Sequence, residues 1–63
     1  MAGTSFGEVI REARRSKGWS QAELGDRAGL SRPTIARVEA DCDVTTATIA
    51  KVAGALGLTL QLR

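Results

Sequence analysis

The 63-residue sequence has no histidine and a single cysteine, Cys42. One cysteine cannot form a disulfide framework within the chain, and it favours a reducing compartment. No spacing of Cys, Asp and Glu indicates a metal site, no nucleophile stands with a base, and no glycine-rich loop is arranged to cradle phosphate. The sequence therefore argues against an enzyme and predicts no metal and no cofactor.

Long hydrophobic runs are also missing. No apolar run approaches the roughly 20 residues that cross a bilayer, and the opening segment MAGTSFGE lacks the charged and apolar regions of a signal peptide. We therefore expect a cytoplasmic protein with no membrane partner. A chain this short buries only about 60% of its extended surface on folding, so oligomerisation is the remaining route to extra stability.

Neither sign of charge dominates the sequence, and the formal net charge is only +2 at pH 7. That excess alone does not identify a nucleic-acid-binding protein, whereas the distribution of charge is informative. Acidic residues cluster at Glu39, Asp41 and Asp43. The basic residues precede them, first in a run and then at spaced positions: Arg11, Arg14, Arg15, Lys17, Arg27, Arg32 and Arg37.

The segment SQAELGDRAGLSRPTIARVE predicts two short helices, over residues 20–28 and 31–40, joined by a tight turn. Ser20 caps the first helix, and Gly29 ends it in the left-handed conformation. Ser31 caps the second helix, and Pro33 falls in its first turn, where no backbone donor is needed. A short helix with cationic and hydroxyl side chains, held by a helix behind it, describes a DNA-binding helix-turn-helix.

Helical periodicity predicts two further helices, over residues 5–17 and 45–56. Ser5 and Thr45 are their candidate caps. Trp19 is expected to plug the core, and stacking on a nucleic-acid base is the alternative. The apolar positions expected to face the core are Phe6, Val9, Ile10, Ala13, Ile49, Val52, Ala53 and Leu56.

The end of the sequence follows a different period. Leu58, Leu60 and Leu62 alternate with polar residues, which indicates a β-strand over about residues 58–62. One strand cannot satisfy its own backbone groups, so we expect it to pair with the same segment of a second copy across a two-fold axis. The alternatives are a frayed tail whose leucines pack on the fourth helix and a dimer built from that helix.

A set of residues matches one known family in a single register: Gln21, Leu24, Gly29, Ser31, Arg32, Thr34, Ile35, Arg37 and Glu39. With these residues the chain resembles the Xre/Cro repressor family of bacteria and phages. The resemblance implies an all-α fold, a four-helix lambda-repressor-like helix-turn-helix domain, here with the short C-terminal strand paired across a dimer. Two departures are visible. Gly25 replaces the usual Ala, which should loosen its helix by up to about 1 kcal/mol, and Asp41 and Asp43 replace residues that are basic in many relatives.

The resemblance also implies which residues contact DNA. The third helix would enter the major groove, with base contacts from Arg32, Pro33, Thr34 and Arg37. Each arginine can donate two hydrogen bonds to guanine, whereas proline offers only apolar contact. Solvated surface arginines are the alternative, and capping is the competing role for the hydroxyl residues below. The implied phosphate contacts are Gln21, Ser20, Ser31, Thr45 and Thr46.

One ion pair is implied by the same resemblance. In this family an arginine at the position of Arg14 pairs with the glutamate that matches Glu39, and so ties the first helix to the third; a phosphate contact is the alternative for Arg14. The other basic residues outside the third helix, Arg11, Arg15, Lys17 and Arg27, are expected to be solvated.

The leading functional hypothesis is a homodimeric transcriptional repressor, associated with the nucleoid. It would recognise a palindromic operator in double-stranded DNA, with half-sites about one helical turn apart. The alternative is an antitoxin that binds a toxin protein and represses its own operon. A controller of a restriction–modification system is a variant of the first hypothesis, and a purely structural bundle would show no salt-dependent DNA binding.

Overall fold

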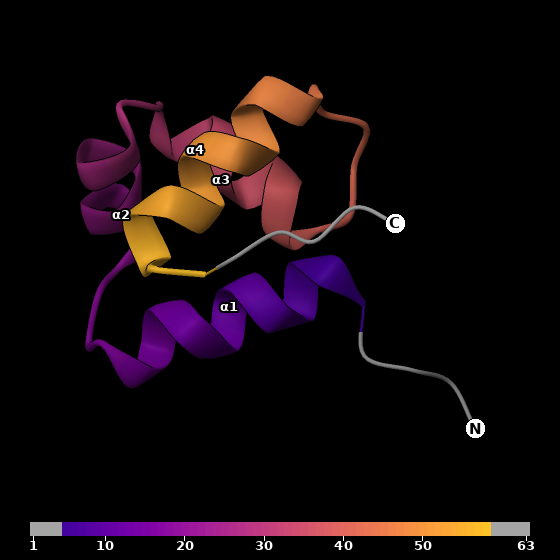
Figure 1. Cartoon of the computed structure of the whole chain (residues 1–63). Coiled ribbons are helices and arrows are strands. Elements are labelled where there is room, and N and C mark those ends of the chain that lie inside the picture. The colour runs from indigo at the N-terminus through magenta and orange to yellow at the C-terminus, as the bar shows by residue number, and fades with distance from the viewer. Residues whose placement is uncertain (1–4, 59–63) are drawn as a thin grey trace.

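Each helix begins directly after a hydroxyl side chain. In the computed structural model, which describes residues 5–58, the helices are α1 (Phe6–Ser16), α2 (Gln21–Ala28), α3 (Arg32–Glu39) and α4 (Thr46–Leu56) (Figure 1). The hydroxyl oxygen before each helix accepts a hydrogen bond of 3.0 to 3.3 Å from a backbone N–H in the first turn. This bond satisfies a donor that would otherwise lack a partner. The capping residues are Ser5, Ser20, Ser31 and Thr45.

Residues of different type adopt a left-handed backbone at the C-terminal ends of α2 and α3. Gly29 ends α2 with a φ of +71°, a left-handed conformation that glycine adopts without strain. The residue after the C-cap of α3 is instead Asp41, which has a φ of +60°. Among the residues that the structure describes, Asp41 is the one non-glycine residue with a positive φ.

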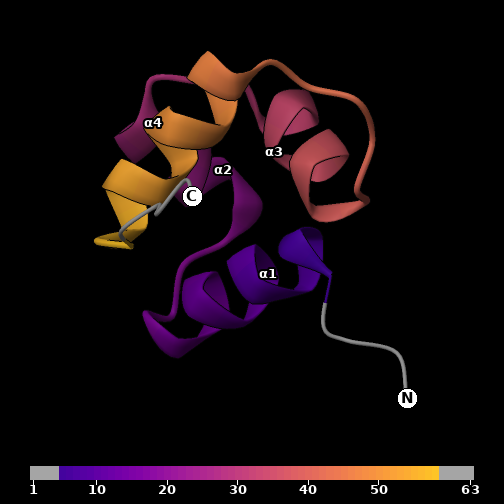
Figure 2. The same cartoon turned by 45° about the vertical axis from the view of Figure 1, so that its right-hand side comes forward.

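Helix α1 forms one side of the molecule, and the other three helices gather opposite it (Figures 1 and 2). Over residues 5–58, the all-α, four-helix arrangement with a helix-turn-helix formed by α2 and α3 agrees with the helical part of the expected fold class. Within residues 5–58, no helix is both long and apolar enough to span a membrane.

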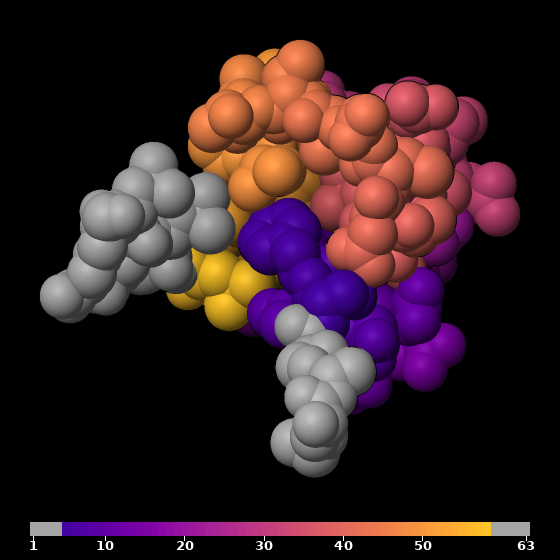
Figure 3. Space-filling model, turned by 90° about the vertical axis from the view of Figure 1, so that its right-hand side faces the viewer, coloured from indigo at the N-terminus to yellow at the C-terminus, as the bar shows by residue number. Residues whose placement is uncertain are grey.

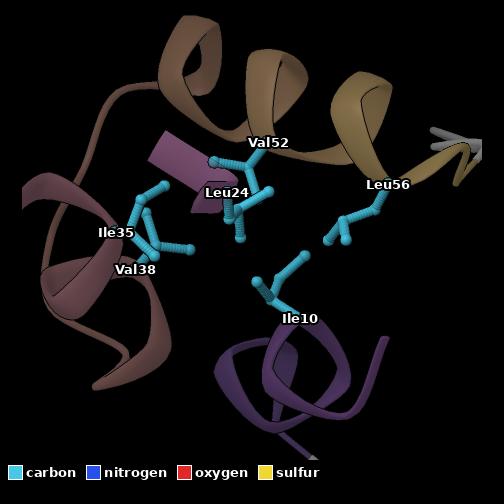
Figure 4. Close-up of a cluster of buried hydrophobic side chains, with 6 residues drawn as sticks. All are labelled: Ile10, Leu24, Ile35, Val38, Val52 and Leu56. Carbon is cyan, nitrogen blue, oxygen red and sulfur yellow. The ribbon is translucent and has the colours of Figure 1, made fainter. Parts of the chain in front are cut away.

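The core lies where the four helices meet, and every helix contributes to it (Figure 4). Each of its six large side chains is at most 4% exposed, and burying such a side chain contributes about 1.5–3 kcal/mol. Trp19 is half-buried and packs against this cluster, so its expected core role is confirmed. The cluster comprises Ile10, Leu24, Ile35, Val38, Val52 and Leu56.

Four residues of the predicted apolar faces are not fully buried, and two of them, Phe6 and Ala13, are half-buried against the core cluster. Val9 is 41% exposed, because α1 turns Gly7 and Arg14 toward α3 and thereby rotates Val9 away from the centre of the molecule. Ile49 is half-buried, one turn nearer the start of α4 than the fully buried Val52.

The predicted C-terminal strand falls almost entirely outside the described residues. Leu58 is 36% exposed, and its N–H donates to the carbonyl of Ala53 at 2.9 Å, which closes the end of α4. No strand occurs within residues 5–58. Leu60 and Leu62 lie beyond them, so the paired strand stays a prediction.

Candidate nucleic-acid interface

Helix α3 has one side in the core and one side at the surface. Ile35 and Val38 are buried, whereas Arg32, Pro33 and Arg37 are exposed. Since an α-helix has about 3.6 residues per turn, Pro33 and Arg37 lie one above the other on the surface that points away from the core. Helix α3 therefore presents two guanidinium groups and a proline ring to the solvent.

The one acidic side chain of α3, Glu39, is turned inward and is 3% exposed. Arg14 donates to both of its oxygens, from Nε to Oε2 at 2.6 Å and from Nη2 to Oε1 at 3.0 Å. Gln21 Nε2 donates to Oε1 at 3.2 Å, and Arg11 Nε lies 3.6 Å from the same oxygen. The pairing of Arg14 with Glu39 is thus confirmed, and the cluster ties α1 and α2 to α3.

Opposing effects act on the pKa of Glu39. Burial raises the pKa, but the hydrogen bonds from Arg14 and Gln21 and the charges of Arg14 and Arg11 outweigh it, so the pKa lies below its ordinary value. The hydrogen bond to Glu39 raises the pKa of Arg14. Both groups are therefore charged at neutral pH and neutralise each other. As a result, the exposed surface of α3 carries only positive charge.

The predicted base-contacting residues differ in their present partners. Arg37 Nη2 donates to the carbonyl oxygen of Asp43 at 3.2 Å. Arg32 forms no ion pair with any residue from 5 to 58. Thr34 is half-buried, and its Oγ1 lies 2.9 Å from Ser31 Oγ, within the cap of α3. Both arginines are therefore exposed to the solvent, Arg37 with one backbone partner, while the Thr34 hydroxyl lies within the cap of α3.

The predicted phosphate-contacting residues lie at the N-terminal ends of α2, α3 and α4. The hydroxyls of Ser20, Ser31 and Thr45 accept capping bonds, and that of Thr45 also donates its only proton within the protein. Gln21 donates one amide hydrogen to the buried carboxylate, and its amide nitrogen carries a second hydrogen. Thr46 is exposed. Gln21 and Thr46 thus keep side-chain donors that no capping bond uses.

The turn between α2 and α3 is closely packed. The N–H of Leu30 donates to the carbonyl of Gly25 at 2.8 Å. A Cβ on Gly25 would lie 2.6 Å from the carbonyl oxygen of Leu30, so the backbone would have to shift. The low helix propensity of Gly25 predicts a looser α2, but its missing side chain also permits this close approach.

Besides Arg14, three basic side chains outside α3 contact other residues, and one of them is Lys17, whose Nζ lies 5.4 Å from the ring centroid of Trp19. Arg11 Nη2 donates to the carbonyl of Glu39 at 3.2 Å, so the expectation that Arg11 is merely solvated is wrong. Arg27 is exposed, and its guanidinium carbon lies 4.3 Å from the ring centroid of Trp19. The Nε of Arg27 also pairs with Glu23 at 2.8 Å.

A contact between Asp41 and Gly7 was not foreseen from the sequence. Asp41 Oδ1 accepts the backbone N–H of Gly7 at 2.8 Å, which joins the loop after α3 to the first turn of α1. This bond lowers the pKa of Asp41, and the Ser5 hydroxyl and the Arg11 charge act in the same direction against burial. The sequence gives one local indication of this contact: the predicted helix over residues 31–40 is followed by Asp41 and not by a glycine.

Comparison with known proteins identifies the family of this four-helix fold. A family profile described as Helix-turn-helix matches residues 10–62. The chain belongs to the Xre-type helix-turn-helix family. The family is one of DNA-binding transcription regulators, and α3 is the second helix of the helix-turn-helix.

Several solved structures are similar to this helix-turn-helix chain. The hypothetical transcription factor NHTF from Neisseria is 36% identical with a TM-score of 0.79; the match covers 86% of this chain and 62% of that one, so the chain spans less than two thirds of that factor. A chain of the HipA-HipB-O2-O3 complex and the MDT Protein are each 27% identical with a TM-score of 0.82. Each of these two matches covers 100% of this chain and 94% of the other. No curated protein sequence matches significantly.

Proposed function

We propose that the chain is a sequence-specific, homodimeric transcriptional repressor that places α3 in the major groove of a palindromic operator. The observation that carries this proposal is that α3 buries its one carboxylate, Glu39, and exposes both of its arginines. Arginine can donate two parallel hydrogen bonds to guanine O6 and N7. A helix surface without an exposed carboxylate also avoids repulsion from the phosphates on either side of the groove.

The proposed roles divide between base and phosphate contacts. Arg32 and Arg37 donate to guanines, Pro33 makes apolar contact, and Thr34 contacts a base or a phosphate. The phosphate contacts fix the register and orientation of α3, while the base contacts discriminate between sequences. The residues proposed to contact phosphate are Ser20, Gln21, Ser31, Thr45 and Thr46.

Dimerisation is part of the proposal because one module offers too few base contacts for a genome. Two modules related by a two-fold axis recognise a palindrome, and binding over a promoter in the cytoplasm would exclude polymerase. Leu58 is 36% exposed at the end of α4, which supports an intermolecular contact there. The proposed contact is a two-stranded sheet through Leu58, Leu60 and Leu62 of both copies.

Selection of bound duplexes from a random pool tests the DNA-binding part of the proposal. We expect one enriched palindrome, whose affinity falls steeply with salt because neutralised phosphates release counterions. A duplex of the same composition in scrambled order is the matched control and should bind more weakly at every salt concentration. A pool without enrichment would contradict the proposal.

Removal of residues 59–63 tests the dimer separately. We expect the full chain to sediment as a dimer and the shortened chain as a monomer. The shortened chain should retain its helical content, because it keeps all four helices and the six-residue core cluster described within residues 5–58. A shortened chain that still dimerises would contradict the strand and favour an interface on α4.

A second candidate function is that of an antitoxin. It is favoured by the likeness, over 100% of this chain, to a chain of the HipA-HipB-O2-O3 complex. In this function α3 would still bind an operator, while another surface binds a toxin protein. Co-expression of the tagged chain with the product of a neighbouring reading frame tests it. A stable complex that reduces the toxicity of that product would support the antitoxin, whereas DNA binding without a partner would favour the plain repressor.

A further inference from the structure

The loop between α3 and α4 is held by hydrogen bonds at both ends. At one end, Asp41 Oδ1 accepts the N–H of Gly7 at 2.8 Å. At the other, the carbonyl oxygen of Asp43 accepts a hydrogen bond of 3.2 Å from Arg37 Nη2. Figure 3 shows this segment, in salmon and orange, in contact with the indigo N-terminal end of α1. The loop therefore links the start of α1 to an arginine on the exposed surface of α3.

The backbone of Asp41 makes this link specific. Its φ of +60° is unfavourable for most residues that carry a side chain, although aspartate and asparagine tolerate it best. The N–H of Asp41 donates to the carbonyl of Val38 at 3.1 Å, and the next N–H, of Cys42, donates to the carbonyl of Arg37 at 3.0 Å. These bonds and the contact with Gly7 together fix the direction in which the chain leaves α3 and thus where the Asp43 carbonyl lies.

We propose that Asp41 is a positioning residue for DNA recognition, because it holds the loop whose Asp43 carbonyl orients Arg37. A guanidinium held by one carbonyl has less rotamer freedom to lose on binding, and its other N–H groups can still donate to guanine. Arg32 has no such link to the loop. Discrimination at the base pair recognised by Arg37 therefore depends on Asp41, whereas discrimination at the base pair recognised by Arg32 does not.

This inference rests on the proposed function, because it assigns a base contact to Arg37. The variants Arg37→Ala and Arg32→Ala first identify which base pair of the selected operator each arginine recognises. Asp41→Gly then removes the carboxylate but keeps a residue that adopts the left-handed backbone freely. Asp41→Asn is the matched control, since it keeps both the oxygen acceptor and the tolerance of a positive φ.

Dissociation constants are measured for the operator and for duplexes changed at either base pair. We expect Asp41→Gly to lose about threefold to tenfold in discrimination at the Arg37 base pair, a fraction of what a complete bidentate contact provides. Discrimination at the Arg32 base pair should be unchanged, and Asp41→Asn should match the wild type at both. Adding Asp41→Gly to Arg37→Ala should cause no further loss, because both changes remove one coupled interaction.

Three results would overturn the inference. Equal losses at both base pairs would indicate general damage to α3, and unchanged discrimination at the Arg37 base pair would leave Asp41 without a role in recognition. If Arg37→Ala changes no base-pair preference while Arg32→Ala does, the inference fails but the proposed DNA binding stands. A random pool with no enriched sequence would instead remove the proposed function itself.

A second measurement does not depend on the folding of any variant. The side-chain Nε–H groups of Arg32 and Arg37 are compared by NMR relaxation in the DNA-free wild-type protein. We expect Arg37 to be the more ordered on the picosecond–nanosecond timescale, because its guanidinium has a backbone acceptor. Equal mobility of the two side chains would contradict the orienting role of the loop.

Discussion

The two sides of α3 differ in whether their charged side chains are buried and paired or exposed to the solvent. On the inner side, the Glu39 side chain is 2% exposed and its partner Arg14 is 11% exposed, and the two form a bidentate pair. On the outer side, Arg32 and Arg37 face the solvent. The buried charges are used to hold three helices together, and the exposed charges keep donors for a ligand. We therefore expect inner-side changes to alter the free energy of unfolding and outer-side changes to alter DNA binding.

The largest effect on unfolding is expected for Arg14→Met. This change leaves Glu39 as a buried carboxylate without its main partner, which costs about 3–5 kcal/mol. A domain of this length has a total stability of roughly 3–9 kcal/mol at 0.05–0.15 kcal/mol per residue. Because that loss is about a third or more of the total, urea unfolding followed by circular dichroism and Trp19 fluorescence should show a midpoint at a much lower urea concentration than in the wild type.

Arg27→Met is the matched control for this prediction. Arg27 also pairs with a glutamate, but its side chain is 51% exposed and that of Glu23 is 44% exposed. Exposed pairs contribute only about 0–1 kcal/mol, because water screens both charges. If the two variants lost equal stability, burial would not be the reason that the Arg14 pair matters.

Low pH should reduce the stability that the buried Glu39 pair gives to the wild-type protein. The pKa of Glu39 in the folded state lies below its ordinary value of 4.5, so its pair contributes fully above that pH. The contribution is lost as the pH falls through the lowered folded-state pKa, since protons then bind the unfolded state more readily. Urea unfolding from neutral pH down to about pH 3 should show stability that is level first and then falls. A protonated carboxyl keeps hydrogen bonds, so the loss should be smaller than in Arg14→Met.

Glu39→Gln separates this titration from that of the other carboxylates. The variant should be less stable than the wild type at neutral pH, and the difference should shrink as the pH falls. A constant difference across the acid range would show that the charge of Glu39 does not stabilise the fold. A part of the acid dependence should persist in the variant, because the pKa of Asp41 is also lowered.

The close approach of α1 to α3 gives a smaller effect. A Cβ on Gly7 would overlap the carbonyl oxygen of Glu39 and lie 2.9 Å from Asp41 Oδ1. Gly7→Ala should therefore destabilise by about 1–3 kcal/mol, although alanine favours helix. Gly54→Ala is the control, because open space surrounds that position in α4. It should stabilise by up to about 1 kcal/mol. Equal changes in melting temperature would show that α1 has room to shift.

Local chemistry was sufficient to predict the helices. The hydroxyls of Ser20, Ser31 and Thr45 bond to N–H groups three residues away, and Gly29 provides the left-handed turn. These signals lie within one helical turn of each other, so spacing in the sequence identifies them directly. The exposure of the α3 arginines follows from the same period, since the apolar residues of α3 define the opposite side.

The contacts between helices could not be predicted from local spacing in the sequence. Arg11 and the Glu39 carbonyl are 28 residues apart, and Gly7 and Asp41 are 34 residues apart. The pairing of Arg14 with Glu39 was expected only from the family resemblance. Periodicity also identifies an apolar stripe but not its rotation, so Val9 was placed in the core and is 41% exposed.

Arg32→Ala should affect unfolding least and complete the comparison. Arg32 is exposed, so its removal should change the free energy of unfolding by no more than about 0.5 kcal/mol. Affinity for the selected operator should fall by about 1–3 kcal/mol, with relaxed preference at one base pair. Arg32→Lys keeps the charge but lacks the planar fork of donors, so it should restore the salt dependence of binding without restoring the base preference. Fluorescence anisotropy with operator duplexes, beside urea unfolding of the same samples, makes both measurements. If Arg32→Ala instead lowered both the free energy of unfolding and the DNA affinity, Arg32 would contribute to the fold, and the two surfaces of α3 would not have separate roles.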